Sequence, residues 1–376
     1  MTSQTDQPMP SANPQAPPVS GSAKVHHSHR LLYTIIAILV LANGVLMWNL
    51  GSLRPRPKIA IVTSGEGPYW DTVISGAQEA ARIYDVDLTV IKTRTDVQAQ
   101  TQAIRSLLGK GYKGVGVSPI SPIGQAGILA ELANDTTLVT FDSDSPVSRR
   151  LCFVGTDNYT AGRIAGEQVH RAIPEGGEVA IVIGNLDKEN TQRRRQGVID
   201  ELLERPFNPD QAMDPPEQMI RGEKYTILPT IVDHSDPAAA TALAIEAINQ
   251  HPNLKCFVGM LSYSTPAILK ALQTTGKLGQ IKVVGFDVND QTLEGIEAGH
   301  VFATIMQDQF GCGYHTVRLL AETARGDRSG LPTFQRRTLP VEVINRNNVD
   351  TIRALVHEEG IMPEPAPPTQ PAAGAG

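Results

Sequence analysis

Two stretches decide the fold of this chain: IAIVTSGEGPYWDTVISGAQEAA at residues 59–81 and VAIVIGNLDKENTQRRRQGVIDELL at residues 179–203. Each reads as an apolar strand, a polar loop and a helix that carries a glycine, Gly76 or Gly197, in an early turn. The chain therefore contains an internal repeat. Strand–helix units in series are typical of parallel sheets with helices on both faces. We predict an α/β protein of two similar lobes with a ligand cleft between them, because such sheets bind ligands beyond the carboxyl ends of their strands.

The rest of the chain continues this alternation. The first half predicts strands at 58–63, 88–91, 114–117, 138–141 and 152–154, with helices at 69–84, 97–108 and 123–133 and one that ends at 173. The second half predicts strands at 178–183, 226–232, 256–259 and 281–286, with helices at 191–203, 238–249 and 266–273. The proline-rich stretch 205–222 reads as a loop insertion. The part of the chain that follows the N-terminal segment is long enough to form two domains, each with its own hydrophobic core.

One segment outside the repeat is apolar enough to cross a membrane. Residues 31–50, LLYTIIAILVLANGVLMWNL, carry no charge, and at ~1.5 Å per residue such a run just spans the hydrocarbon core. Two fates stay open: a signal segment cleaved near Ala42-Asn43-Gly44, or a retained transmembrane anchor, which the long leader favours. We expect the globular part to face the periplasm or cell exterior, although the basic residues that follow the span mildly oppose this orientation.

The flanking segments and the composition narrow the class of protein. Most of the leader 1–30 is poor in large apolar residues, and the tail 359–376 is rich in proline. We predict that both segments are disordered. The formal net charge is −6 and no dense basic patch stands out, so we expect no nucleic-acid partner. The sequence shows no spacing of residues typical of a metal site. It leaves open whether two of the three cysteines, Cys152, Cys256 and Cys312, form a disulfide.

Six short motifs carry a resemblance to a known family. They are GPYW, TFDSD, GTDN, RRRQG, VVGFD and ATIMQ, which end at residues 70, 144, 158, 197, 287 and 307. In order and spacing the chain from Lys58 to Asn347 resembles the periplasmic sugar-binding proteins of the ribose-binding type, the solute receptors of ABC importers. The resemblance implies two lobes joined by three hinge strands that close on a sugar. It places lobe one at 58–156 and 308–338, and lobe two at 157–307 and 339–358.

Four candidate ligand residues belong to the first lobe. A sugar has apolar C–H faces and a rim of hydroxyls, so its site needs flat aromatic rings and bidentate polar groups. Tyr69 and Trp70 follow the first strand, and we expect at least one of them to stack on the ligand rather than serve only as a core pair. Asp142 ends a strand, where its carboxylate can accept from two adjacent hydroxyls. Ser118 stands where the family often has Asn, and its shorter reach weakens that contact.

Five further candidates belong to the crossovers and the second lobe. Asn158 and Gln307 match family ligand positions near two crossovers, with a helix cap as the alternative for Asn158. Arg194 matches the family's binding arginine, and its fork suits vicinal hydroxyls, although the basic cluster leaves sugar acids and sugar phosphates open. Asp287 ends a strand at another family position. Tyr263 lies where the ribose binder has an Asn contact, which indicates a sugar other than ribose.

We interpret the chain as a receptor, expected to be monomeric, that binds a monosaccharide or related polyol and presents it to an ABC-type permease in the membrane. A ligand-sensing subunit for a sensor kinase or chemoreceptor is the main alternative. A lac-repressor-type regulator is disfavoured by the apolar span, which occupies the place of a DNA-binding motif. A glycoside hydrolase using Asp142 and Asp144 is disfavoured, because no environment that raises a carboxyl pKa can be read. We expect no catalytic residue, cofactor or metal, since the familiar hydrolase, zinc and nucleotide motifs are absent.

Overall fold

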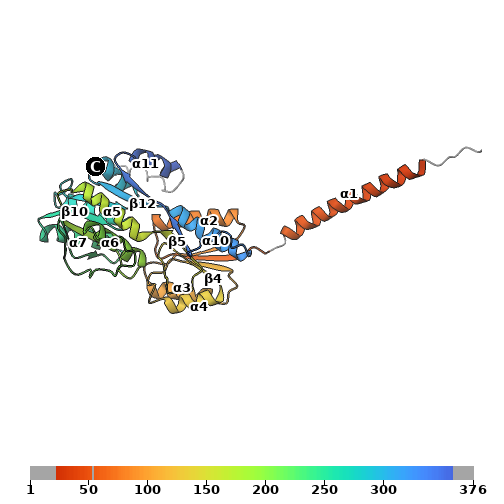
Figure 1. Cartoon of the computed structure of the whole chain (residues 1–376), viewed down its shortest axis with the longest axis horizontal. Helices are drawn as coiled ribbons and strands as arrows, with labels where there is room; N and C mark the ends of the chain where they lie inside the picture. Colours follow the sequence, from red (N-terminus) through yellow and green to blue (C-terminus); the bar gives the residue numbers. More distant parts are fainter. Residues whose placement is uncertain (1–22, 53–54, 359–376) are drawn as a thin grey trace, which may run out of the picture. The chain divides into compact units, whose positions relative to one another are not determined.

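The computed structural model describes residues 23–52 and 55–358, and the chain divides into two units at Pro55. The first unit contains helix α1 (Ala23–Ser52), and its stretch His29–Leu46 has a mean hydropathy of 1.7 and no buried residue (Figure 1). By length and composition this helix is able to cross a membrane. The sequence predicts an unstructured leader through residue 30, but residues 23–30 begin α1, because no Pro or Gly interrupts them. The rest of that leader and the predicted tail lie outside the described residues.

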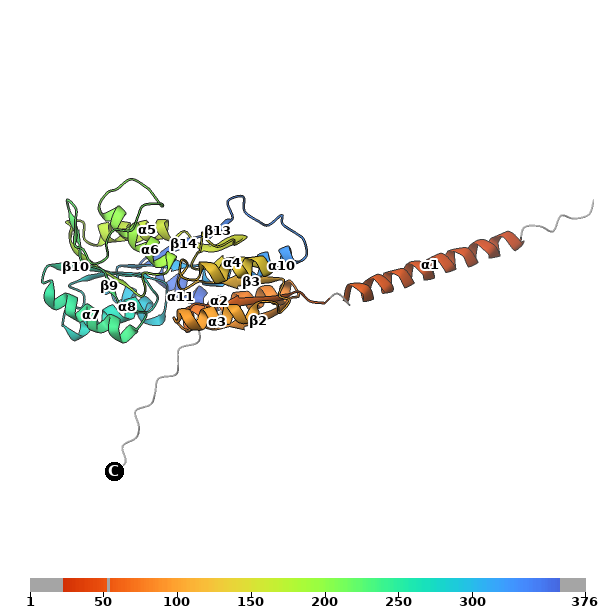
Figure 2. The same cartoon turned by 90° about the horizontal axis from the view of Figure 1, so that it is seen from below.

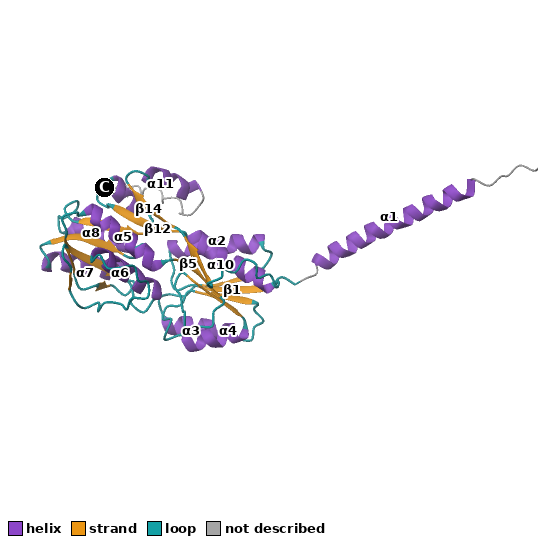
Figure 3. Ribbon diagram, in the orientation of Figure 1, coloured by secondary structure: helices purple, strands orange, loops and turns teal. Residues whose placement is uncertain are grey.

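The first lobe of the second unit is a six-stranded parallel sheet in the order β13-β5-β4-β3-β1-β2. Alternate residues of the central strand face opposite sides, as the two-residue period of a strand requires. Ile59 and Ile61 pack under α2 and α10, whereas Ala60 and Val62 pack under α3 and α4 (Figures 1 and 3). The strands are β1 (Lys58–Val62), β2 (Asp87–Ile91), β3 (Gly114–Val117), β4 (Thr137–Phe141), β5 (Cys152–Thr156) and β13 (Arg336–Leu339). The helices are α2 (Pro68–Ile83), α3 (Val97–Leu107), α4 (Ala126–Asp135) and α10 (Gln309–Ala324).

The second lobe repeats this plan around an eight-stranded sheet in the order β14-β12-β11-β10-β6-β8-β7, with β9 paired to β6. Helices α5 and α6 cover one face, and α7 and α8 cover the other (Figure 2). Helices α9 and α11 pack on the same face as α7 and α8. The strands are β6 (Gly177–Ile183), β7 (Ile220–Arg221), β8 (Tyr225–Ile227), β9 (Ile231–Val232), β10 (Leu254–Gly259), β11 (Lys282–Phe286), β12 (Ala303–Gln307) and β14 (Val341–Asn345). The helices are α5 (Asn158–Ala172), α6 (Glu189–Leu202), α7 (Pro237–Gln250), α8 (Ser264–Thr274), α9 (Asp290–Glu297) and α11 (Val349–Glu358).

The chain passes between the two sheets three times. It crosses between β5 and α5, between β12 and α10, and between β13 and β14. The structure thus has two doubly wound sheets joined by three short crossings. The predicted α/β architecture is confirmed. The crossings also place the carboxyl ends of the strands of both lobes at the region between them.

The internal repeat has a packing reason. In each lobe two helices lie so close that a side chain between them has no room: a Cβ on Gly76 of α2 would collide with the carbonyl oxygen of Phe310 in α10. In the same way, a Cβ on Gly197 of α6 would collide with the carbonyl oxygen of Tyr159 in α5. Since only glycine allows this approach, the two glycines mark the same helix pair in both lobes.

Two predicted elements differ from the structure. The strand predicted at 226–232 is divided into β8 and β9, because Pro229 between them has no N–H to donate to a sheet. The helix predicted at 123–133 begins only at Ala126, after a turn in which the backbone N–H of Gln125 donates to Ser121 O. The predicted loop insertion at 205–222 is loop except for β7. All three cysteines are buried and free, so none forms the disulfide that the sequence leaves open.

Candidate functional site

A cavity of about 450 Å³ lies between the lobes, at the carboxyl ends of their strands. We call it the inner cavity. Two of the nine predicted ligand residues, Ser118 and Asn158, do not line it. The other seven do; they are Tyr69, Trp70, Asp142, Arg194, Tyr263, Asp287 and Gln307. The fold therefore brings seven of the predicted residues, from segments far apart in the chain, together in the inner cavity.

Asp142 follows β4 in a left-handed backbone conformation with φ 60°, which Asp tolerates better than most residues. Its Oδ1 accepts from the Tyr69 hydroxyl at 2.8 Å and from Asn190 Nδ2 at 3.2 Å. Its Oδ2 accepts from Ser118 Oγ at 2.8 Å. Ser118 thus supports Asp142 from behind and does not face the cavity. The protein itself already supplies three hydrogen bonds to this carboxylate.

Two of the groups on Asp142 come from the other lobe. Asn190 lies in α6, and Lys188 directly precedes this helix, with its Nζ 3.6 Å from Asp142 Oδ2. Lys188 Nζ also donates to Ser64 Oγ at 2.7 Å and lies 5.6 Å from the ring centroid of Trp70. Burial lowers the pKa of Lys188, while the nearby Asp142 carboxylate acts in the opposite direction. These contacts hold the two lobes directly against each other.

Asp287 occupies the corresponding position after β11, with the same φ of 60°. Its Oδ1 accepts from Gln307 Nε2 at 2.9 Å and from Gln309 Nε2 at 3.0 Å. Within residues 23–52 and 55–358, no group donates to its Oδ2. Burial raises the pKa of Asp287, and the Arg194 guanidinium counteracts this. Asp287 therefore has an acceptor oxygen left for a hydroxyl in the cavity.

Arg194 is fully buried, and its planar guanidinium is fixed by three acceptors. Its Nε donates to Asn158 Oδ1 at 2.8 Å, one terminal nitrogen donates to Met260 O at 3.1 Å, and the other donates to Gln307 Oε1. The guanidinium carbon lies 4.9 Å from the ring centroid of Phe286. A guanidinium has five N–H groups, and the residues that the structure describes use three of them, so two remain for a ligand. Asn158 positions Arg194 instead of facing the cavity, and Asp157, not Asn158, caps α5.

The aromatic residues both pack and line the cavity. Trp70 is only 7% exposed and meets Phe141 edge-on at 6.3 Å between ring centroids, so it belongs to the core, and it also lines the cavity. Stacking on the ligand stays a prediction. Tyr263 donates its hydroxyl to Asp233 Oδ1 at 2.6 Å. Asp233 is buried, and burial raises its pKa to about 6. The hydrogen bond fixes the Tyr263 ring as a wall of the cavity.

Asp144, the second carboxylate of TFDSD, does not line the inner cavity. It is fully buried and accepts from Thr140 Oγ1 at 2.7 Å and from Arg150 Nη2 at 2.8 Å. A carboxylate held by an arginine in this way is not placed to act with Asp142 on a bound glycoside. Among the described residues no group of His, Cys, Asp and Glu is arranged to hold a metal.

Residues 59–328 match a family model described as a periplasmic binding protein domain. The chain belongs to the periplasmic binding protein family. It is 22% identical over 294 residues to the D-allose-binding periplasmic protein of Escherichia coli, covering 75% of this chain and 89% of that protein. It is 25% identical over 268 residues to a D-ribose/D-allose-binding protein of Pseudomonas aeruginosa, covering 68% and 77%. A glucose-galactose binding protein from Geobacillus stearothermophilus has a similar fold, with a TM-score of 0.70 at 22% identity over 78% of this chain and 99% of that chain.

In this periplasmic binding protein, three residues that contact the two cavity carboxylates escape sequence reasoning. They are Lys188 and Asn190, which contact Asp142, and Gln309, which contacts Asp287. A lysine in the polar stretch NLDKEN looks like a solvated surface residue. The internal repeat holds the missing signal, because aligning its two strands places 188–190 close to the position of Tyr69 and Trp70. The loop that follows the first strand thus reaches the cavity in both lobes.

Proposed function

We propose that this chain is an extracytoplasmic solute receptor that binds a neutral monosaccharide or related polyol in the inner cavity and presents it to an ABC-type permease. The observation that carries the proposal is the set of unused hydrogen-bonding groups between the lobes. Asp287 has an oxygen free to accept, and Arg194 has two N–H groups free to donate. A sugar hydroxyl both donates and accepts, so adjacent hydroxyls match this pair.

The charges around the cavity support a neutral ligand. Its walls contain three acidic and three basic residues: Glu66, Asp142, Asp287, Arg94, Lys188 and Arg194. Two of the basic charges lie in ion pairs, Lys188 beside Asp142 and the exposed Arg94 at 3.4 Å from Glu66 Oε2. The third, Arg194, is bonded to three neutral acceptors, and its charge acts on the nearby Asp287 carboxylate. An anionic group that reached Arg194 would have to enter the same cavity as the carboxylates of Asp142 and Asp287, which repel it. We therefore favour sugars and polyols over sugar acids and sugar phosphates.

The relatives support the same class of ligand. Two of them are named for binding D-allose or D-ribose, and a structural neighbour for binding glucose and galactose. Binding would stabilise the closed arrangement, because a ligand between Asp287 and the first-lobe aromatics contacts both lobes. A permease would then recognise the closed form.

Helix α1 supports a location outside the cytoplasm, either tethered or released. If α1 is retained, the receptor fractionates with membranes and keeps residues near its N-terminus. A soluble mature form that begins near Val45 would instead show that the span is a cleaved signal. Membrane fractionation followed by N-terminal sequencing separates the two fates, and neither result changes the proposed ligand.

A thermal-shift screen of the full chain tests the proposal. The probes are monosaccharides and polyols, with sugar acids and sugar phosphates as the contrasting set. A neutral sugar at ~100 times its Kd is expected to stabilise the fold by ~2.7 kcal/mol, while the anionic sugars give no shift. Stabilisation by a sugar acid or phosphate alone would contradict the neutral ligand. Stabilisation by neither set would contradict the proposed function.

A further inference from the structure

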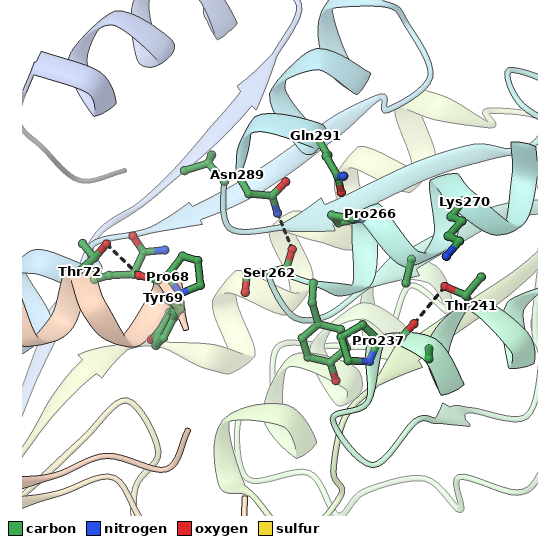
Figure 4. A pocket seen from close by; sticks show the side chains of 15 residues that line it. Pro68, Tyr69, Thr72, Pro237, Thr241, Ser262, Pro266, Lys270, Asn289 and Gln291 are labelled. Carbon is green, nitrogen blue, oxygen red and sulfur yellow. Dashed lines mark hydrogen bonds between the residues drawn. The ribbon is translucent and has the colours of Figure 1, made fainter. Parts of the chain in front are cut away.

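A second cavity, of about 540 Å³, lies beside the inner cavity. We call it the outer cavity. Figure 4 shows its two sides: Pro68, Tyr69 and Thr72 at the start of α2, and opposite them Thr241 of α7 and Pro266 of α8. Its walls therefore come from both lobes, like those of the inner cavity.

The two cavities adjoin at residues that line both of them. Tyr69 and Tyr263, from different lobes, belong to this shared set, and the others are Pro68, Pro237 and Ser262. The hydroxyl of each tyrosine is tied to a carboxylate, at 2.8 Å for Tyr69 and Asp142 and at 2.6 Å for Tyr263 and Asp233. Because these hydrogen bonds hold the rings in place, the tyrosines present fixed carbon surfaces at the junction.

The outer cavity differs from the inner cavity in chemistry. The inner cavity is lined by six charged residues, whereas the outer cavity is lined by one, the exposed Lys270. Three prolines, two tyrosines, two alanines and a valine make most of the outer wall, and amide and hydroxyl side chains such as Gln291 and Thr241 complete it. Rings and small apolar groups with a few amides suit the C–H faces and hydroxyl rim of a sugar ring without charge.

We infer that the ligand carries a second sugar ring that lies in the outer cavity, so that the receptor binds a disaccharide more tightly than the monosaccharide of its inner ring. This inference rests on the proposed function, because the first ring must occupy the inner cavity. The glycosidic link would then pass beside Tyr69 and Tyr263, which line both cavities. A neutral second ring also agrees with the outer wall, where Lys270 is the one charged residue and lies exposed to solvent.

Calorimetric titration of the full chain, in a detergent without a sugar head group, tests the inference. The probes are D-glucose with cellobiose and maltose, D-galactose with lactose and melibiose, and D-xylose with xylobiose. At least one disaccharide is expected to bind about tenfold more tightly than its own monosaccharide. The p-nitrophenyl glycosides of the same sugars serve as ligands whose second group is apolar.

A matched pair of variants shows where the gain arises. Ala238 is exposed, lies in the first turn of α7 and lines only the outer cavity, so Ala238→Trp fills that space without disturbing the core. Asn249→Trp places the same ring on an exposed position at the far end of α7, which lines neither cavity. We expect Ala238→Trp to remove the disaccharide gain and to leave monosaccharide affinity within about twofold. We expect Asn249→Trp to change neither.

The outcomes separate this inference from the proposed function. If monosaccharides bind but no disaccharide binds more tightly, or if the gain survives Ala238→Trp, the second ring is overturned and the receptor function stands. If only the p-nitrophenyl glycosides gain, the outer cavity takes an apolar group and the second sugar ring is again overturned. If no saccharide binds at all, the proposed function itself fails.

Discussion

Asp142 and Asp287 occupy the same place in the two lobes and yet differ in what surrounds them. Each follows a phenylalanine that ends a parallel strand, and each has a φ of 60°. Asp142 receives hydrogen bonds on both oxygens, partly from the opposite lobe. Asp287 receives both of its hydrogen bonds on Oδ1. The two lobes thus supply two carboxylates at the cavity that share a φ of 60° and differ in how many further hydrogen bonds they can accept.

The difference indicates two roles. The donors on Asp142 include Asn190, and the ammonium of Lys188 lies nearby, so this carboxylate is where the lobes hold each other. Asp287 is bonded by residues of the crossover between β12 and α10, and its open oxygen is available to a ligand. We therefore expect loss of Asp287 to act mainly on affinity and loss of Asp142 to act mainly on closure.

Asp287→Asn is expected to have the largest effect on sugar binding. Asn tolerates the left-handed backbone but removes the charge, so affinity for the best sugar should fall by ~1.5–3 kcal/mol, the range for hydrogen bonds to charged groups. The melting temperature without sugar should change little or rise, because burial already disfavours the charged carboxylate. Calorimetry and melting curves measure the two quantities. Wild-type affinity in this variant would show that Asp287 does not contact the ligand.

The start of α6, which follows Lys188 and contains Asn190, is expected to make stability depend on pH through Glu189. Burial, and then the Asp144 carboxylate of the other lobe, raises the pKa of Glu189 from 4.5 to about 7, while Arg336 and Arg193 act in the opposite direction. A carboxyl whose pKa is raised by folding favours the folded state below its unfolded pKa, and this contribution is lost as the pH rises through the folded pKa. The loss should be about 3 kcal/mol between pH 4.5 and 8, because a pKa change from 4.5 to about 7 corresponds to ~1.4 kcal/mol per unit.

Urea unfolding of wild type and Glu189→Gln at pH 5 and pH 8 measures this contribution. The glutamine variant keeps the shape of the side chain and cannot ionise, so its free energy of unfolding should fall less between the two pH values. Identical pH profiles for the two proteins would contradict a buried Glu189 at the contact between the lobes.

Asp142→Asn is expected to loosen the contact between the lobes by about 1 kcal/mol, the typical net value of one hydrogen bond. The amide cannot accept on both atoms, so one of the hydrogen bonds from Tyr69, Ser118 and Asn190 is lost. Solution scattering without sugar should give a larger radius of gyration for this variant than for wild type, and Asp287→Asn is the matched control that should not. Equal expansion in both variants would remove the difference between the two carboxylates.

Lys188→Met should give the smallest effect. The methionine keeps the apolar stem near Trp70 and removes only the ammonium, whose pKa is already lowered by burial. We expect affinity for a neutral sugar to change by less than about threefold, or ~0.6 kcal/mol. A loss of tenfold or more in calorimetry would place Lys188 among the ligand contacts and would reopen the case for an anionic sugar.

Some of the site follows from the sequence because parallel strands bring their carboxyl ends together. Asp142 and Asp287 each come directly after an apolar run, so a lobe with a strand there must place them at the cavity. The order of helices and strands follows in the same way from the repeat. The hydroxyl of Ser118 and the amide of Asn158 have several directions open to them, and only packing decides that they support Asp142 and Arg194.

The contacts between the lobes are the part that sequence reasoning misses. Lys188 and Asn190 contact Asp142 from the other lobe. No local sequence pattern predicts these contacts, because they depend on how the three crossings place one sheet against the other. The division of 226–232 into two strands was open to prediction from Pro229 alone.

A crystal structure of the full chain with the sugar that gives the largest stabilisation tests the account most directly. We predict sugar hydroxyls on Asp287 Oδ2 and on the two free N–H groups of Arg194, with Lys188 and Asn190 still beside Asp142. A sugar bound to Asp142 in place of Lys188 and Asn190, or bound away from Asp287, would contradict the division of roles between the two carboxylates.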